Sequence, residues 1–370
     1  MIIIVKVMDN KKKIALIGYR LNKGGAERVM ATLSNFFFEK GFEVHIIIFH
    51  DELGYAYSGT VFNLGKFKTK TNSIINKIKR FYYFNKYMKQ FEFDFIIDFR
   101  FRINIIQEIL INKYIYKAKT IYTIHSSKID NYLPRATSLT RFIYGHTYAM
   151  VSISKTMKKL VEETHQLKNV KTIYNAVDVT LIKSKAVELI NLNFDFIIGV
   201  GQYDTNVKQF DKLIKAYAKS ELPQKNIALV ILGDGKLRNS LLNIINDYKI
   251  NHLVHLLGFV CNPYKYISKS KYFVLTSKFE GFPMVLIEAL ACETPVIAFD
   301  CPTGPKEIIQ QEINGLLIED QNMDKLIQAM NVMLSNDVLY SRCKMNAKIS
   351  IDKFSLSVIG GQWLDLMSYN

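Results

Sequence analysis

The hydrophobic positions of the chain fall into short continuous runs, and segments of helical spacing separate them. Five runs lie in the first half, at residues 14–19, 44–49, 94–99, 119–125 and 149–154, and six in the second, at 195–201, 227–233, 253–258, 272–277, 295–299 and 315–319. Continuous apolar strands that alternate with helices are typical of a parallel sheet covered on both faces. Two such series predict an α/β protein of two doubly wound, Rossmann-like domains.

The two series are separated by residues 175–193, where no strand pattern holds. We therefore predict a first domain over residues 1–178 and a second over 179–354. Ligands of such folds bind beyond the carboxyl ends of the strands. The cleft between the two domains is the expected location of the site.

Composition narrows the class of protein. At 370 residues with 49% hydrophobic residues, the chain is long enough to bury two cores, and general disorder is excluded. No uncharged apolar run approaches the ~20 residues that span a bilayer. The four cysteines form no CxxC pair, which favours free thiols in a reducing cytosol over a metal site or disulfides. We expect no signal peptide, and we expect residues 1–7 to be dispensable because Met8 offers a second start.

The net charge of +16 is concentrated in the first half of the chain. Residues 1–180 carry 29 Lys and Arg against 14 Asp and Glu, whereas the remainder carries 20 against 19. The first half should therefore meet something anionic: nucleic acid, a membrane surface or a phosphorylated substrate.

One segment, "FEGFPMVLIEALACETPV" at residues 279–296, combines an apolar helix with two carboxylates. Pro283 suits the first helical turn, so Glu280 precedes the helix and Glu288 lies inside it. The free N–H groups near Met284 and Val285 would bind phosphate. This pattern predicts a phosphate site with a carboxylate on either side. The alternative is that Glu280 only favours the helix dipole and Glu288 faces solvent.

A second candidate anion loop is "NKGGAERV", residues 22–29, which follows the first strand and opens a helix. Gly24 and Gly25 would allow a phosphate to approach the backbone. The alternative is an ordinary tight turn before a helix.

Taken in order, these motifs resemble the GT-B retaining glycosyltransferases of group 1, also called family 4. The resemblance rests on "GGAERV", His125 at a strand end, "YNAVD", "GVGQYDTNVKQFDKLIKAYA", "LGDGKLR", "LLGFVCNPY", "FEGFPMVLIEALACETPV" and "NGLLI". It covers the chain from Lys13 to about Ile318. The last segment, "FSLSVIGGQWLDLM", resembles the family's final helix, which implies that residues 355–370 pack back on the first domain.

The resemblance implies roles for individual residues. Glu280 matches the first glutamate of the family's Glu-x7-Glu element, which lies near the donor sugar, and Glu288 matches the second, which holds the ribose. Lys208 matches the lysine that neutralises the leaving diphosphate. His125 matches a histidine that touches the donor sugar.

The resemblance also assigns donor-binding positions. Gly24 and Gly25 match the loop at the cleft, close to the phosphates and the acceptor. Val260 matches a backbone contact to the nucleotide base. Gln202 is a departure, because the family usually has an arginine there.

Three explanations for Gln202 remain open. The site relies on Lys208 and helix N-termini alone, or Lys212 or Arg238 supplies a second cation, or Gln202 contacts nothing.

The expected reaction breaks a sugar–diphosphate bond through an oxocarbenium-like state. Lys208 and fixed N–H dipoles would stabilise the charge on the departing diphosphate without reorganising. No metal and no other cofactor is then required, and no Asp-x-Asp element stands in the right place. The donor is expected to be a UDP-linked hexose or N-acetylhexosamine.

The acceptor is expected to bind the basic first domain. Residues 73–91, "SIINKIKRFYYFNKYMKQF", mix apolar and aromatic residues with five basic ones, which favours binding to an anionic membrane surface. We therefore expect a cytoplasmic enzyme, peripheral on the inner face of the membrane, that uses a glycan or lipid-linked glycan acceptor in bacterial surface-polysaccharide or glycan assembly. The alternative for this segment is a packed helix with a solvated basic side.

Two other functions compete with this interpretation. Another GT-B enzyme, such as a nucleotide-sugar epimerase or a phosphorylase, is disfavoured by the ordered motifs. A nucleic-acid-binding protein is suggested by the charge alone and lacks recognition modules, so we expect no nucleic-acid partner.

Overall fold

The computed structural model describes residues 11–22, 24–68 and 74–368. The prediction about residues 1–7 lies outside the described residues. The chain divides into two compact units. Unit 1 comprises the described residues up to Ile153, then Lys158–Ile173 and the chain from Gln362 onward, and unit 2 comprises Ser154–Met157 and Tyr174–Gly361.

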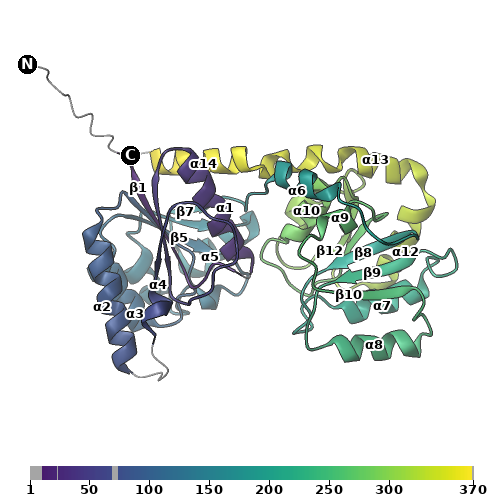
Figure 1. Ribbon diagram of the computed structural model, residues 1–370, viewed down its shortest axis with the longest axis horizontal. Helices are drawn as coiled ribbons and strands as arrows, with labels where there is room; N and C mark the ends of the chain where they lie inside the picture. Colours follow the sequence, from purple (N-terminus) through teal and green to yellow (C-terminus); the bar gives the residue numbers. More distant parts are fainter. Residues whose placement is uncertain (1–10, 23, 69–73, 369–370) are drawn as a thin grey trace, which may run out of the picture. The chain divides into compact units, whose positions relative to one another are not determined.

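Unit 1 is built on a parallel sheet of seven strands in the order β3-β2-β1-β4-β5-β6-β7 (Figure 1). The strands are β1 (Lys13–Gly18), β2 (Glu43–Ile48), β3 (Thr60–Asn63), β4 (Phe95–Asp98), β5 (Lys119–Ile124), β6 (Ala149–Ser152) and β7 (Val170–Thr172). The central strands are buried along almost their whole length, as expected for a sheet covered on both faces.

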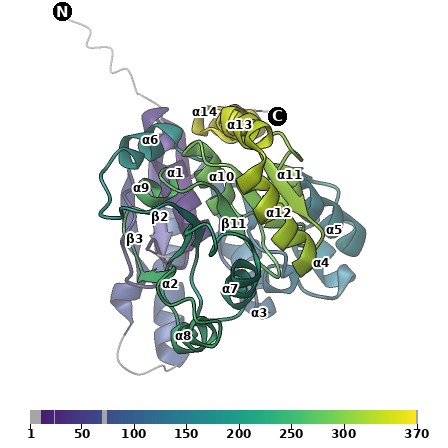
Figure 2. The same ribbon diagram turned by 90° about the vertical axis from the view of Figure 1, so that its right-hand side faces the viewer.

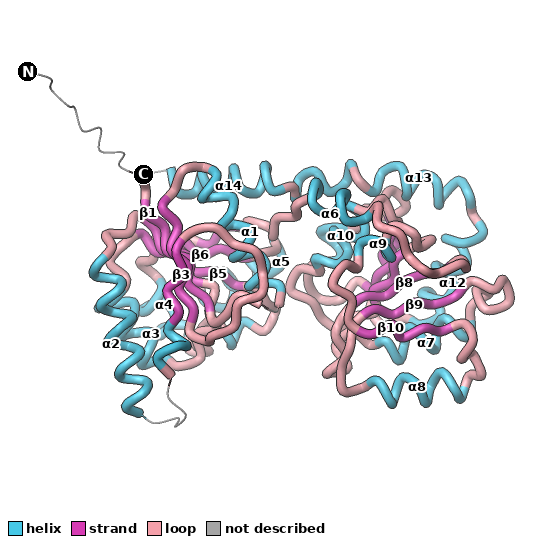
Figure 3. Tube along the Cα trace, in the orientation of Figure 1, coloured by secondary structure: helices cyan, strands magenta, loops and turns pink. Residues whose placement is uncertain are grey.

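The helices of unit 1 connect these strands (Figure 3). They are α1 (Gly25–Glu39), α2 (Ile74–Gln90), α3 (Ile105–Leu110), the π-helical turn η2 (Ile111–Ile115), α4 (Thr137–Tyr144) and α5 (Lys155–His165), with short 3₁₀ turns at Leu64–Phe67 and Ile129–Asn131. The first turn of α5 belongs to unit 2 by its contacts, and the rest belongs to unit 1.

Unit 2 carries a second parallel sheet, with six strands in the order β10-β9-β8-β11-β12-β13. The strands are β8 (Phe196–Val200), β9 (Ala228–Leu232), β10 (Val254–Gly258), β11 (Phe273–Leu275), β12 (Val296–Phe299) and β13 (Gly315–Ile318). Buried side chains from β8, β9 and β12 form one core with those of the helices that cover the sheet.

The helices of unit 2 surround this sheet, and α7 and α12 pack against each other (Figure 2). They are α6 (Val179–Ala186), α7 (Phe210–Lys219), α8 (Arg238–Asp247), α9 (Tyr264–Ile267), α10 (Met284–Ala291), α11 (Pro305–Ile308), α12 (Met323–Ser335), α13 (Asp337–Ala347) and the 3₁₀ turn Ile349–Phe354.

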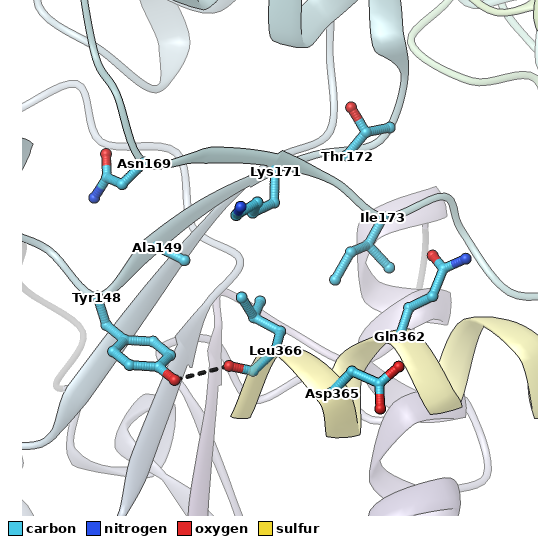
Figure 4. Close-up of a pocket in the computed structure, with 9 residues that line it drawn as sticks. All are labelled: Tyr148, Ala149, Asn169, Lys171, Thr172, Ile173, Gln362, Asp365 and Leu366. Carbon is cyan, nitrogen blue, oxygen red and sulfur yellow. Dashed lines mark hydrogen bonds between the residues drawn. The ribbon is translucent and has the colours of Figure 1, made fainter. Parts of the chain in front are cut away.

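The last helix, α14 (Leu356–Ser368), begins in unit 2 and ends in unit 1. Its end lies beside β6 and β7, where the Tyr148 hydroxyl donates to the Leu366 carbonyl at 2.8 Å (Figure 4). A cavity of about 460 Å³ lies between these elements and is lined by Tyr148, Lys171, Ile173 and Asp365 among others (Figure 4). It contains none of the site residues that the sequence predicts.

The predicted fold class is confirmed, with two doubly wound sheets and a terminal helical segment. Two strands were missed, β3 and β7, which occupy the two edges of the first sheet. Their sequences, "TVFN" and "VKT", are short and partly exposed, because an edge strand has no neighbour on one side and does not require a continuous apolar run.

Candidate active site

The candidate site of unit 2 begins where the order of its strands reverses. Strand β8 pairs with β9 on one side and with β11 on the other. The chain continues from β8 toward one edge of the sheet and from β11 toward the other edge. Ligands of doubly wound sheets bind at such a point, outside the carboxyl ends of the strands. Gln202 and Lys208 follow β8, and Ser277 and Glu280 follow β11.

An ion pair joins these two segments. Lys208 Nζ lies 2.6 Å from Glu280 Oε1, and their side chains are 20% and 13% exposed. The Ser277 hydroxyl donates to the same carboxylate oxygen at 2.6 Å. Since both groups have lost most of their contact with water, each requires the other's charge. The structure thus brings together Lys208 and Glu280, two of the residues to which the resemblance assigns donor contacts.

The backbone around Lys208 is fixed to the segment that carries Glu280. The Thr276 hydroxyl donates to the carbonyls of Lys208 and Gln209, at 2.9 and 3.1 Å. The Lys278 N–H donates to the Val207 carbonyl at 2.8 Å. A Cβ at Gly201 would lie 3.1 Å from the stem of Lys208, so the glycine makes room for the lysine to lie across the end of β8.

A third segment, the loop after β12, holds the backbone of Glu280 in place. The Thr303 hydroxyl donates to the Glu280 carbonyl. Gly304 has φ +99°, and a Cβ there would overlap the ring of Pro283. Sequence reasoning missed Ser277 and Thr303 as residues that position Glu280. Their location directly after β11 and β12, at the carboxyl edge of the sheet, is the signal that could have identified them.

Helix α10 presents its N-terminus beside this cluster. Pro283 caps the helix in an extended conformation, one residue earlier than the sequence predicts, and the helix begins at Met284. The first N–H groups of the helix, at Met284 and Val285, have no helical carbonyl to bond to. Glu288 is only 5% exposed, so the alternative that it faces solvent is wrong.

A buried thiol lies near the ion pair. Burial raises the pKa of Cys301 to about 12, with a further contribution from the negative charge of Glu280. The thiol therefore stays protonated at neutral pH. Because the thiolate is the reactive form of cysteine, Cys301 does not serve as a nucleophile here.

The structure bears on the three explanations for Gln202, which is exposed. Lys212 Nζ is 2.5 Å from the Gln321 side-chain oxygen. Arg238 donates to the Tyr203 hydroxyl at 3.3 Å and to the Leu256 carbonyl at 3.0 Å. Both substitute cations thus have protein partners, as Lys208 has in Glu280, and the three explanations stay predictions.

Val260 follows a strand that is farther along the sheet from the Lys208–Glu280 pair. It is half-buried and follows β10, the edge strand, which is separated from β8 by β9. A base contact at Val260 is therefore compatible with an extended nucleotide, and it stays a prediction.

In unit 1, Gly24 and Gly25 lie at the start of α1, which follows β1. Gly24 has φ +99°, a conformation that favours glycine, and both residues are exposed. They follow β1 and lie at the carboxyl edge of the sheet, and their place near the phosphates stays a prediction.

His125 follows β5, and its ring stacks on Phe99 at 5.4 Å. Both ring nitrogens are shielded from solvent and have no hydrogen-bond partner among the described residues. Burial, helped by the nearby positive charge of Arg102, lowers the pKa of His125 to about 3. His125 is therefore neutral at physiological pH, with one donor and one acceptor nitrogen.

Comparison with known proteins agrees with this geometry. The family model described as glycosyl transferases group 1 matches residues 180–350, and that of glycosyltransferase family 4 matches residues 23–181. The chain belongs to this family of GT-B retaining glycosyltransferases, and it is a hexosyltransferase-type enzyme.

Two Campylobacter jejuni enzymes are similar over almost the whole chain. One is N-acetylgalactosamine-N,N'-diacetylbacillosaminyl-diphospho-undecaprenol 4-alpha-N-acetylgalactosaminyltransferase, 33% identical, with 93% of this chain and 96% of the relative covered. The other is an alpha-1,4-N-acetyl-D-galactosaminyltransferase whose name gives a diNAcBac-PP-undecaprenol-linked acceptor, 30% identical, with 96% and 98% covered.

Among solved structures, Alr3699/HepE of Anabaena in complex with UDP superposes with a TM-score of 0.77 and 18% identity, covering 96% of this chain and 99% of that one. At this identity the likeness shows the fold alone.

The ion pair leads to a prediction about Glu280→Gln. The neutral amide releases Lys208, which becomes fully available to a diphosphate. We expect transfer to be lost and UDP to bind more tightly, by up to about tenfold, the scale of one charge-assisted hydrogen bond. Isothermal titration with UDP measures the affinity.

The matched control is Glu312→Gln. Glu312 pairs with Arg342 at 3.2 Å on the exposed surface of the same unit, so this variant should leave UDP affinity unchanged. Weaker UDP binding by the Glu280 variant would contradict the view that the two side chains compete for Lys208.

Proposed function

We propose that this enzyme transfers a hexose or N-acetylhexosamine from a UDP-sugar to a lipid-linked glycan, with retention of configuration. The observation that carries the proposal is the Lys208–Glu280 pair at the strand reversal of unit 2, next to the N-terminus of α10 and the buried Glu288. The names of the two Campylobacter relatives support undecaprenol-linked acceptors and N-acetylgalactosamine as the sugar.

In this proposal, the arriving diphosphate exchanges for Glu280 as the partner of Lys208. The lysine and the first N–H groups of α10 then stabilise the negative charge that grows on the leaving nucleotide. The released carboxylate of Glu280 is free to bind the hydroxyls of the donor sugar. Protein groups thereby balance the negative charge of the departing diphosphate, and no metal is required.

The acceptor's hydroxyl attacks the anomeric carbon as the bond to the diphosphate breaks. In a retaining enzyme, the new bond forms on the face that the diphosphate leaves, so the departing phosphate oxygens are placed to accept the hydroxyl proton. The neutral His125 is proposed to hydrogen-bond the sugar without introducing a second positive charge.

A donor panel tests the reaction class. UDP-GalNAc, UDP-GlcNAc, UDP-galactose and UDP-glucose are each incubated with a diphospho-undecaprenol-linked or short-chain glycan acceptor, and UDP release and product anomericity are measured. An α-linked product from one α-linked donor is expected. Failure to bind UDP or to release it from any donor would contradict the proposal.

The role of Glu288 gives a second prediction. Glu288→Ala removes the carboxylate proposed to hold the ribose hydroxyls, so UDP affinity should fall by about tenfold or more, on the scale of hydrogen bonds to a charged group. Titration of UDP into the variant measures this loss. An unchanged affinity would assign Glu288 a purely structural role, and circular dichroism reports whether the fold is intact.

A third prediction separates the explanations for Gln202. If Lys208 is the lone cation, Lys208→Ala loses several orders of magnitude in kcat/KM. Gln202→Arg adds a forked donor and tightens UDP binding by roughly tenfold. High turnover by the Lys208 variant would contradict the lone-cation explanation and favour Arg238 or Lys212 as the second cation.

We also propose that the enzyme is peripheral on the cytoplasmic face of the membrane. No helix among the described residues is long and apolar enough to span a bilayer. Helix α2 carries Lys77, Lys79, Arg80, Lys86 and Lys89, and no acidic residue. Its inner side packs through the buried Phe84 and Met88, which leaves its exposed lysines for an anionic surface.

Charge reversal at Lys77, Lys79 and Lys86 tests this attachment. Arg80 is left intact because it is half-buried and its Nη1 is 3.4 Å from the Phe49 carbonyl. Binding to vesicles that contain phosphatidylglycerol should fall at least tenfold, at about 1 kcal/mol per basic group, while transfer to a water-soluble acceptor is retained.

The control reverses three exposed lysines of unit 2, Lys215, Lys219 and Lys249, and changes the net charge equally. If both triple variants lost vesicle binding equally, net charge alone would explain the binding, and α2 would have no specific role.

A further inference from the structure

Exposed apolar side chains follow the outer face of α3 and η2 in unit 1. Ile103, Ile106, Leu110 and Tyr114 are 70%, 73%, 39% and 54% exposed. Ile106, Leu110 and Tyr114 are four residues apart and form one stripe along the helical segment, and Ile103 lies two residues before α3. A surface helix normally turns such a stripe toward the core. Here the stripe, which we call the α3 stripe, faces away from it.

The inner face of the same segment is held by polar contacts. Glu108 is buried and accepts from Arg100 Nη2 at 3.1 Å, and the same nitrogen is 2.7 Å from Asp98 Oδ2. Asn112 Nδ2 donates to the Ile143 carbonyl at 2.7 Å, and Asn104 caps the helix by accepting from the Gln107 N–H. The outward orientation of the α3 stripe is therefore fixed by specific bonds.

Two neighbouring helices also carry exposed apolar side chains. Turn η2 packs against α2. On α2, Ile75, Ile78 and Tyr82 are 75%, 63% and 60% exposed. The Asn112–Ile143 bond joins η2 to α4, on which Phe142 is 71% exposed.

The charges around the α3 stripe have one sign. In α4, in residues 103–117 and among the described side chains of α2, the only acidic residue is Glu108, and it is buried. The exposed charged side chains are Lys77, Lys79, Lys86, Lys89, Lys113, Lys117 and Arg141. An exposed surface of apolar and basic side chains is complementary to a surface that offers both hydrocarbon and negative charge. A second copy of the same surface would bring like charges together.

We propose that the α3 stripe inserts into the headgroup–acyl boundary of an anionic membrane and is the apolar anchor of unit 1. The lysines of α2 then supply long-range attraction, which salt screens, and the stripe supplies insertion, which salt does not screen. The inference rests on the proposed function, because it explains how the acceptor domain meets a lipid-linked acceptor.

The test replaces Ile103 and Ile106 with serine. Flotation is measured with vesicles of phosphatidylcholine alone and of phosphatidylcholine mixed with phosphatidylglycerol, at low and high salt. Loss of two exposed isoleucines should weaken binding about tenfold or more and abolish the salt-resistant fraction. The control, Val338→Ser with Met345→Ser, alters residues of unit 2 that are 77% and 71% exposed and should float like the wild type.

Insertion is measured directly with Ile106→Trp. The chain has one tryptophan, Trp363, which is 3% exposed, so its emission should respond little to vesicles. The introduced indole should shift to the blue when vesicles are added and should be quenched by lipids brominated along the acyl chain.

Three results would overturn the proposal. One is unchanged flotation of the serine pair. Another is unchanged emission of the Ile106→Trp variant although it floats. The last is a wild-type dimer that the serine pair converts to monomer without lipid, which would make the stripe an interface between copies. Transfer to a water-soluble acceptor should be unaffected by the serine pair. A wild type that transfers no sugar would overturn the proposed function and leave the vesicle results standing.

Discussion

The ion pair between Lys208 and Glu280 is the interaction on which the candidate site of unit 2 depends. It joins the segments that follow two strands distant in the sequence, and it satisfies two charges that are largely removed from water. A buried pair of this kind contributes little net stability, because desolvation offsets the attraction. In the proposed function, a diphosphate takes the place of the carboxylate, so the pair holds the charge of Lys208 in position before the donor binds.

Hydrogen bonds from neighbouring residues hold this pair in place. Thr276 fixes the backbone at Lys208, Thr303 fixes the backbone at Glu280, and Ser277 bonds the carboxylate directly. All three follow strands of the same sheet, at its carboxyl edge. The parallel topology of unit 2 thus determines which residues can meet, and the side chains determine what they bind.

Much of this arrangement could be predicted from the sequence. Continuous apolar runs identified the central strands because burial on both faces demands them, and the two glutamates of residues 279–296 were recognisable from their spacing around a helix start. The edge strands β3 and β7 escaped because they need no such runs. Ser277 and Thr303 escaped because the only signal of a single hydroxyl is its position after a strand, at the carboxyl edge of the sheet.

The α3 stripe could not be predicted by periodicity. Spacing alone places Ile106, Leu110 and Tyr114 on one helix face and implies that the face is buried. The structure reverses this, because Arg100 and Asp98 hold Glu108 inside. A buried charge network of residues close in the sequence decides the orientation, and hydrophobic spacing contains no information about it.

A double-mutant cycle between Lys208 and Glu280, measured as UDP affinity, tests the central claim most directly. The wild type, Lys208→Ala, Glu280→Gln and the double variant are titrated with UDP under one set of conditions. If the carboxylate and the diphosphate compete for the lysine, the gain in affinity from Glu280→Gln disappears in the Lys208→Ala background. An equal effect of Glu280→Gln in both backgrounds would contradict the account.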